Sequence, residues 1–537
     1  MVMSTVVDRS KNVIPGPPTA LPPQTRAIAV AFGLIATAVS AAGSGVPSLW
    51  GDEAASLLSA QRPLPSLLRM LTHVDAVHGL YYLGLHGWIR LVGDSPFAIR
   101  FPNAVAIGLA VAAITVLASR HGGPVAAIAA SIAGTVLPRL TYAGEEARSF
   151  AFTAAAAGWL TLLLVWLIDG RGRDAPARAQ RWRWALYAAG MTVASYLFLY
   201  FASMLVAHLG ILVFARASRP VLRAWAISAG AVLLVLSPLA LLAFFERRQI
   251  AYLGRETLNP QQLLAEPWFG SVWDTMAAWA AILLALGGGL LLWRRAGGRF
   301  RPGRAAARTG TEPPQTATLS TTVVAGCWLV LPTAVLFLAN LVFPLYTPRY
   351  STFTAPAAAL LVAEGVLLAA RLLASRSRVP MAAAAGAGLL AFAAICLPAY
   401  LSQRGPYSKA NSDWSEVSAA IGEYARPGDA VVFDESTRPS RRPRLAARTY
   451  PAGFAAVKDV TLRTPFAENI GWEDKAYSVP EAAALGRFDG VRRVWLIEDD
   501  EDGNLSDYGL ADLETLGFEE TGLRVPTHRT LLIELSR

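Results

Sequence analysis

Two adjacent carboxylates, Asp52 and Glu53, follow the first long apolar run of the chain. Ionisable groups at the edge of a membrane are costly to desolvate, so they are generally paired or functional. A carboxylate in such a place can act as a general base that takes a proton from an acceptor hydroxyl. The alternative is a solvated helix terminus, because acidic side chains interact favourably with the first turn of a helix. The spacing alone leaves both interpretations open.

Two further segments hold polar residues that could take part in catalysis or binding. Asp75 and His78 precede Tyr81 in the stretch after the first run, and Glu146 and Arg148 share a short loop. A histidine titrates near neutrality and can bind a phosphate or an acceptor; the alternative is a capping aspartate and a surface histidine. Glu146 can position an acceptor, or Arg148 can simply neutralise it.

Arginines at the ends of apolar runs form a third group of candidates. Arg349 and Tyr350 lie between two late runs, Arg100 opens the second run, and Arg247 and Arg248 follow a middle run. The planar guanidinium group suits a phosphate. Arg100 either extends its side chain to the interface or pairs with an anion. The same residue types are also common at any membrane interface.

The chain lacks the usual signatures of cofactor chemistry. We find no glycine-rich phosphate loop, no metal-ligand spacing, no Ser-His-Asp order and no dinucleotide fingerprint in the apolar part of the sequence. The two cysteines, Cys327 and Cys396, lie inside apolar runs, which argues against a disulfide framework. We therefore expect neither a metal nor an organic cofactor.

The composition indicates a polytopic membrane protein. Hydrophobic residues make up 54% of the 537 residues and charged residues 16%, against about 25% charged in soluble domains. Apolar runs near the roughly 20 residues that span a bilayer recur along the chain. We expect 11 spans, at 27–48, 99–118, 124–141, 150–168, 184–199, 201–215, 222–243, 275–293, 320–342, 353–373 and 379–399. The region 184–215 fits two short helices or one long helix.

The distribution of arginine orients these spans. With the N-terminus in the cytoplasm, one parity places every basic cluster on the cytoplasmic side. Residues 1–26 then form a disordered cytoplasmic tail, with a cleaved signal peptide as the alternative. The loops that hold the candidate residues fall on the opposite, extracytoplasmic side. We therefore expect a multi-pass plasma-membrane protein whose chemistry occurs at its outer face.

The organisation has three parts: the tail 1–26, a transmembrane module 27–399 and an extracytoplasmic domain 400–537. The net charge is +16 over residues 1–399 and −6 over the remainder. Short membrane loops explain the basic residues, so we reject a nucleic-acid partner. Segments 54–60, 64–72 and 80–92 have the spacing of interfacial amphipathic helices. The C-terminal part predicts an α/β fold, with strands at 430–434, 492–497 and 529–535 and helices at 413–425 and 479–486.

Taken in order, these motifs resemble the GT-C superfamily of polyprenyl-phosphate-sugar-dependent glycosyltransferases. Its protein O-mannosyltransferase-like and lipid A aminoarabinose transferase-like branches, of actinobacterial type, are the most similar. The motifs that carry the resemblance are Asp52-Glu53, His78-Gly79-Leu80-Tyr81-Tyr82, Arg100, Glu145-Glu146-Ala147-Arg148-Ser149-Phe150 and Pro348-Arg349-Tyr350. Gly79 stands where the family usually has proline, and Phe150 where it usually has tyrosine.

The resemblance implies a GT-C-like bundle and an inverting transfer of a sugar, with mannose first and arabinose second, from a polyprenyl phosphate. The acceptor would be an envelope glycan, lipid or protein. It implies catalytic roles for Asp52, Glu53 and Glu146. The residues implied to bind the donor phosphate are Arg349, Tyr350, Arg100 and Arg148, and those implied to bind substrate are His78, Asp75, Tyr81, Arg247 and Arg248.

Two other classes remain as alternatives. A transporter or lipid flippase would also have many spans, but we would expect broken helices and polar sites near the midplane of the membrane. A non-catalytic scaffold would use its outer domain to bind a glycan or a protein. The crowding of polar residues at one face favours the enzyme.

Overall fold

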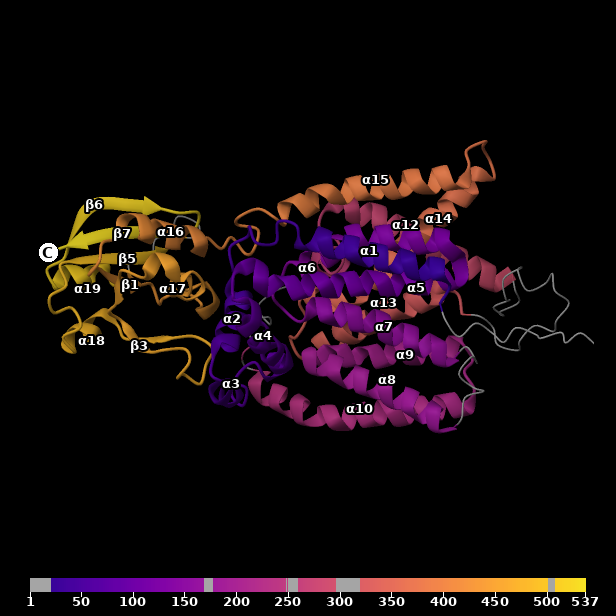
Figure 1. The fold of residues 1–537 in the computed structure, drawn as a ribbon, viewed down its shortest axis with the longest axis horizontal. Helices are drawn as coiled ribbons and strands as arrows, with labels where there is room; N and C mark the ends of the chain where they lie inside the picture. Colours follow the sequence, from indigo (N-terminus) through magenta and orange to yellow (C-terminus); the bar gives the residue numbers. More distant parts are fainter. Residues whose placement is uncertain (1–20, 169–176, 248, 250–258, 296–318, 501–507) are drawn as a thin grey trace, which may run out of the picture.

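The computed structural model describes residues 21–168, 177–247, 249, 259–295, 319–500 and 508–537. A bundle of helices occupies one end of the molecule and an α/β domain the other (Figure 1). Among the described residues, eight helices are long and apolar enough to cross a membrane. The helices of the bundle are α1 (Pro23–Ala41), α5 (Pro96–Val136), α6 (Pro138–Gly144), α7 (Phe150–Ile168), α8 (Ala177–Leu197), α9 (Met204–Phe214), α10 (Arg219–Phe245), α12 (Val272–Arg295), α13 (Thr321–Asn340), α14 (Ala355–Ala374) and α15 (Met381–Ser402).

The longest helix, α5, is two spans joined by a reversal. Its backbone leaves the helical region at Gly123, where φ is +65°. The two halves then pack against each other, and Thr115 and Ser131 share a hydrogen bond of 2.6 Å between their hydroxyls. Each of the 11 predicted apolar runs overlaps a helix, but 27–48 extends beyond the end of α1 at Ala41, and 124–141 covers the end of α5 and part of α6.

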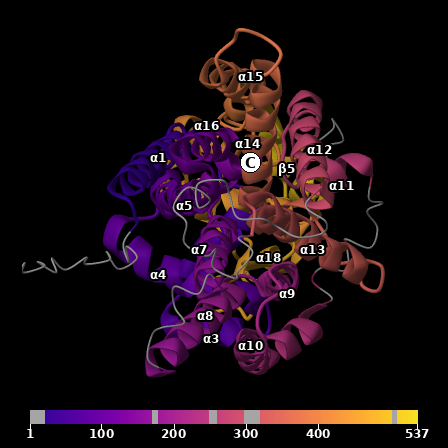
Figure 2. The ribbon, with the colours of Figure 1, turned by 90° about the vertical axis from the view of Figure 1, so that its right-hand side faces the viewer.

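The region 184–215 consists of two helices, α8 and α9. They are separated at Phe198 by the 3₁₀ turn η2 (Leu199–Ser203). Viewed along the bundle, α15 lies on one side and α8 and α10 on the opposite side (Figure 2).

Short helices lie between the bundle and the C-terminal domain (Figure 1). They are α2 (Gly51–Gln61), α3 (Leu64–Met70), η1 (Ala76–His78) and α4 (Gly79–Val92). Their helical structure was predicted, and α2 in addition packs against the C-terminal domain, which was not predicted. Ala54 and Leu58 pack into the core of the C-terminal domain, while Leu57 and Ala60 pack against α3 and α4. Most of α2 is therefore buried between the bundle and the C-terminal domain, while Asp52 and Gln61 stay partly exposed.

The C-terminal domain is built on a five-stranded sheet with the order β2-β1-β5-β7-β6. Its strands are β1 (Ala430–Phe433), β2 (Lys458–Asp459), β5 (Arg493–Asp499), β6 (Glu519–Pro526) and β7 (Thr530–Ser536). β1 is parallel to β2 and β5, whereas β7 is antiparallel to β5 and β6. The three predicted strands are β1, β5 and β7. β6 escaped prediction because it is an edge strand with mostly exposed polar residues.

Helices cover both faces of this sheet. α16 (Trp414–Tyr424) and α17 (Arg444–Thr449) share one apolar core with the sheet, and α18 (Val479–Ala484) and α19 (Leu510–Thr515) share the other. α16 and α18 match the two predicted helices. The remaining short elements are α11 (Pro260–Leu264), η5 (Pro348–Thr354), η6 (Pro439–Arg441), η7 (Pro451–Phe454), β3 (Leu462–Thr464) and β4 (Lys475–Ala476).

Candidate functional site

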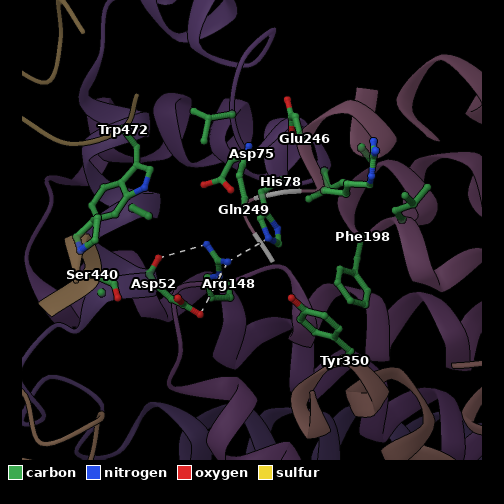
Figure 3. Close-up of a pocket in the computed structure, with 18 of the residues that line it drawn as sticks. Asp52, Asp75, His78, Arg148, Phe198, Glu246, Gln249, Tyr350, Ser440 and Trp472 are labelled. Carbon is green, nitrogen blue, oxygen red and sulfur yellow. Dashed lines mark hydrogen bonds and ion pairs between the residues drawn. The ribbon is translucent and has the colours of Figure 1, made fainter. Parts of the chain in front are cut away.

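A cavity of about 380 Å³ lies where the bundle, the short helices and the C-terminal domain meet; we call it the Asp52 cavity. α2 and η1 supply one wall, the end of α10 a second, η2 and η5 a third, and the C-terminal domain closes it (Figure 3). The polar and aromatic residues that line it are Asp52, Asp75, His78, Arg148, Phe198, Tyr200, Glu246, Arg247, Gln249, Tyr350, Arg438, Ser440 and Trp472.

Asp52 lies in the first turn of α2 and projects into this cavity with 21% of its side chain exposed. Its Oδ2 atom is 2.6 Å from Nη1 of Arg349, which η5 supplies, and 3.9 Å from Nη2 of Arg148. Two guanidinium groups from distant segments thus converge on one carboxylate oxygen. This arrangement places a carboxylate, which can accept a proton, beside positive charge that can stabilise an anion.

The C-terminal domain approaches Asp52 closely because the preceding residue is Gly51. A Cβ atom at this position would lie 2.4 Å from the carbonyl oxygen of Ser440 and 2.6 Å from its Cβ atom. Only a residue without a side chain lets η6 pass beside the first turn of α2. Ser440 and Trp472 therefore form a wall of the cavity on the Asp52 side (Figure 3).

Arg148 connects Asp52 to the segment that contains His78. Its guanidinium donates to the Tyr82 hydroxyl at 3.2 Å and lies 3.0 Å from Nε2 of His78. Burial and the neighbouring charges of Arg148 and Arg349 hold the pKa of His78 well below its usual value. The imidazole is therefore neutral, and Nε2 accepts the hydrogen bond. His78 thus supports Arg148 and also lines the cavity.

Asp75 completes this network. The Tyr82 hydroxyl donates to its Oδ2 atom at 2.9 Å. Burial raises the pKa of the Asp75 carboxyl above its usual value, more than the charge of Arg148 lowers it. Tyr82 was not among the predicted site residues, although it belongs to the same motif, because nothing in the spacing shows that its hydroxyl bridges two charged groups.

The structure gives Glu53 and Arg100 a different role from the predicted one. Both side chains are 0% exposed, and Nε and Nη2 of Arg100 donate to the two carboxylate oxygens of Glu53 at 2.8 and 2.5 Å. The Ala147 amide also donates to Glu53. Neither residue lines the Asp52 cavity. This enclosed and fully paired geometry does not fit the catalytic role predicted for Glu53 or the phosphate-binding role predicted for Arg100. The ion pair instead fixes α2 to α5 and to the loop 145–149.

Tyr81 and the two arginines after α10 also differ from the prediction. Tyr81 lines a separate apolar cleft, and its hydroxyl is 3.3 Å from Oδ1 of Asn103, so it does not contact the Asp52 cavity. Arg247 does line the cavity, with its guanidinium over the Phe244 ring at 4.2 Å. The prediction for Arg248 lies outside the described residues.

A second cavity, of about 300 Å³, is lined by Glu146, the third residue that was predicted to be catalytic. We call it the Glu146 cavity. Arg349 lines this cavity, and its ion pair with Asp52 links it to a residue that lines the Asp52 cavity. The Glu146 side chain is 1% exposed, and its buried Oε1 atom has no hydrogen-bond partner among the described residues. Burial raises the pKa of this carboxyl, although Lys409 and Arg349 lower it.

The segment that leads into the C-terminal domain holds the loop of Glu146 in place. The neighbouring Glu145 is 3.3 Å from Nη1 of Arg404 and 3.4 Å from Nζ of Lys409, which also lies over the Tyr142 ring. The same segment reaches the strand-like stretch before Asp52, where Ser412 donates to the carbonyl oxygen of Leu49 at 2.6 Å. The segment from Arg404 to Ser412 thus positions both the loop of Glu146 and the stretch before Asp52. Sequence reasoning did not predict this role, because no motif lies in the C-terminal part of the chain.

Replacing Lys409 by methionine should lower the thermal stability of the whole protein. Lys409 and Glu145 are both 0% exposed, and removal of one member of a buried ion pair costs about 3 kcal/mol because the other charge stays buried. We expect the Tm in detergent to fall by several degrees, with partial recovery in the Lys409→Met/Glu145→Gln double variant. Lys475→Met, at an exposed position, serves as the control. An unchanged Tm for Lys409→Met would contradict the stated role of this pair.

Comparison with known proteins identifies the fold. No protein-family model and no curated protein matches the chain. Among solved structures, it is similar to ArnT from Cupriavidus metallidurans in the apo state, with 14% identity, 94% of this chain and 97% of that chain covered and a TM-score of 0.50. The same protein bound to undecaprenyl phosphate matches with 15% identity, the same coverage and a TM-score of 0.50. The Archaeoglobus fulgidus oligosaccharyltransferase in complex with zinc and sulfate matches with 12% identity over 87% of this chain and 67% of that chain, with a TM-score of 0.48.

The chain therefore shares the fold of ArnT, and its fold class is the expected one: a polytopic helical membrane bundle followed by a C-terminal α/β domain. Identities of this size establish the fold, while the chemistry must be argued from the site itself.

Proposed function

We propose that this protein is an inverting glycosyltransferase that moves a sugar from a polyprenyl monophosphate to a hydroxyl acceptor at the extracytoplasmic face of a membrane. The observation that carries the proposal is the single carboxylate of Asp52, in contact with Arg349 and close to Arg148, at the junction of two cavities. A base, an anion-stabilising pair and room for two substrates are what this transfer requires.

The chemistry assigns one task to each group. Asp52 takes the proton of the acceptor hydroxyl as its oxygen forms a bond to the anomeric carbon of the donor sugar. The bond between that carbon and the phosphate oxygen breaks, and the phosphate leaves with the electron pair. Arg148 and Arg349 stabilise the charge that develops there. One displacement inverts the anomeric centre, so a single carboxylate base is sufficient, in contrast to the two carboxylates of glycoside hydrolysis.

The Asp52 cavity suits the donor. One of its walls is the end of α10, and the neighbouring side chains Leu241, Phe244 and Phe245 are exposed on the bundle, where lipid would surround them. A polyprenyl tail can therefore stay in the membrane while its phosphate reaches Arg148 and Arg247. The structural relative ArnT has been seen bound to undecaprenyl phosphate, which supports a donor of this class.

Transfer should proceed without a divalent metal. No group of three or more His, Cys, Asp or Glu residues with metal-binding geometry occurs in the part of the chain that the structure describes. A monophosphate leaving group carries less charge than a diphosphate, and the arginines beside Asp52 can neutralise it. We expect EDTA to change the rate of transfer by less than twofold, measured with the purified protein in nanodiscs. A loss of activity that Mg²⁺ or Mn²⁺ restores would contradict this account.

For the sugar we propose mannose, with arabinose as the alternative, and for the acceptor a glycan, lipid or protein of the cell envelope. The test is transfer by purified protein in nanodiscs from radiolabelled polyprenyl-phosphate-mannose, or the arabinose donor, to an envelope lipid extract. Label in the acceptor, with release of an equal amount of polyprenyl phosphate, would support the proposal. Movement of the intact donor across a proteoliposome membrane without cleavage would favour the transporter or flippase instead.

A further inference from the structure

The Glu146 cavity has no ligand assigned to it by the proposed chemistry, yet it adjoins the reacting groups. Its wall consists of α6, the loop of Glu146, the stretch before α12, the start of η5 and the end of α15. The polar and aromatic residues that line it are Arg139, Tyr142, Glu146, Glu266, Phe269, Thr347, Arg349 and Gln403. A cavity of about 300 Å³ is at the small end of ligand pockets, and its size suits a single ring.

Most of the wall is already fixed by contacts within the protein. Nε of Arg139 donates to the carbonyl oxygen of Glu266 at 3.1 Å. The amide of Gln403 donates to the Pro138 carbonyl at 3.0 Å and accepts from the Thr141 hydroxyl at 2.8 Å. These groups shape the cavity but have little capacity left for a ligand.

Two carboxyl groups remain available. Oε1 of Glu146 is buried and has no hydrogen-bond partner among the described residues. Glu266 is half-buried, lines the same cavity and interacts electrostatically with Arg139. A buried oxygen without a partner is costly, so a ligand that donates hydrogen bonds is expected at Glu146. The rings of Tyr142 and Phe269 offer apolar surface beside these oxygens.

The combination defines the class of ligand. Several hydrogen-bond acceptors next to aromatic surface suit a sugar ring, which presents hydroxyl donors at its edge and C–H groups on its faces. A serine or threonine side chain would bring a single hydroxyl. The lining contains two arginines, Arg139 and Arg349, and two carboxyl groups, so a net charge gives a ligand no advantage.

The position of the cavity gives this ligand a role. Arg349 lines the Glu146 cavity and lies 2.6 Å from Asp52, which lines the other. A ring held by Glu146 and Glu266 would therefore lie beside the Arg349–Asp52 pair. Its hydroxyl groups would then be near the proposed base, which is what an acceptor requires.

We propose that the Glu146 cavity is the acceptor subsite and that it takes a sugar residue with at least two free hydroxyl groups, carried by a glycan or a glycolipid rather than by a polypeptide. This inference rests on the proposed function for its assignment to the acceptor. Glu266 is a specificity-determining residue, because it contacts the ring without approaching the reacting carbon.

The test measures binding without turnover, so that its result does not depend on the transfer assay. Full-length protein in nanodiscs, without donor, is titrated with octyl α-mannoside and, separately, with an acetylated octapeptide that contains one threonine. We expect the glycoside to bind and the peptide to bind at least tenfold more weakly. Glu266→Ala should raise the Kd of the glycoside about tenfold and Glu266→Gln by less, because a hydrogen bond to a charged group is lost or weakened.

Glu246→Gln is the matched control, since this carboxylate lines the Asp52 cavity. It should leave the Kd of the glycoside within twofold, while Glu266→Ala should leave the Kd of polyprenyl phosphate within twofold. No binding of the glycoside, equal losses in both variants or preference for the peptide would overturn the inference. Binding with this pattern but no sugar transfer by the wild type would instead overturn the proposed function.

Discussion

Replacing Asp52 by asparagine is expected to lower kcat for sugar transfer by about 10²- to 10⁴-fold, the range that a positioned general base contributes. The amide cannot take the proton of the acceptor hydroxyl, but it has almost the same shape as the carboxylate. Because the side chain is partly exposed to the cavity, the variant should fold and should still bind polyprenyl phosphate. Initial rates at saturating donor and acceptor measure the effect directly.

Asp94→Asn provides the control for this substitution. Asp94 is an exposed aspartate whose Oδ2 accepts a hydrogen bond from the Gln61 side chain at 2.8 Å. It does not line the Asp52 cavity, so the change should leave the rate within twofold. If Asp52→Asn and the wild type transferred sugar equally fast, Asp52 would be removed from the mechanism. The base would then have to be sought at Glu146.

Replacement of the neighbouring carboxylate, Glu53, should mainly lower the stability of the protein, whereas replacement of Asp52 should mainly lower the rate. Glu53→Gln leaves Arg100 charged, fully buried and without its partner, and such a change costs about 3 to 5 kcal/mol. We expect a large fall in Tm and in the yield of monodisperse protein, whereas Asp52→Asn should have a near wild-type Tm. Thermal unfolding of the two variants in the same detergent makes the comparison.

The Glu53→Leu/Arg100→Leu double variant tests whether these two residues form a structural ion pair or act in the active site. Replacement of both members of a buried pair by apolar residues is often close to neutral, so this variant should recover much of the lost stability. A stable Glu53→Gln protein with weakened binding of polyprenyl phosphate would restore the phosphate-binding role first predicted for Arg100.

The sequence predicted that Asp52 and Glu53 lie together at the start of a helix, but it could not predict which of them faces the cavity. The apolar periodicity located α2, and the two carboxylates marked its start. Consecutive residues of a helix point about 100° apart, so only one of them can face the cavity. Which one depends on how α2 packs between the bundle and the C-terminal domain, and no local pattern contains that information.

Long-range pairing had the same limit. Arg349 and Asp52 were both predicted site residues, but their 2.6 Å contact depends on the return of η5 to the end of the bundle. Trp472 and Ser440 line the cavity without any motif, because they come from a soluble domain whose loops have ordinary composition. The spans and the sheet followed from periodicity, since burial in lipid or in a core imposes that periodicity directly.

The measurement that tests the central claim most directly is a structure of the Asp52→Asn protein with a polyprenyl-phosphate sugar, determined in nanodiscs. The account predicts the phosphate in the Asp52 cavity against Arg148 and Arg247 and within reach of Arg349. It places the anomeric carbon near residue 52 and directed toward the Glu146 cavity. A phosphate bound in the Glu146 cavity, or a sugar out of reach of residue 52, would contradict it.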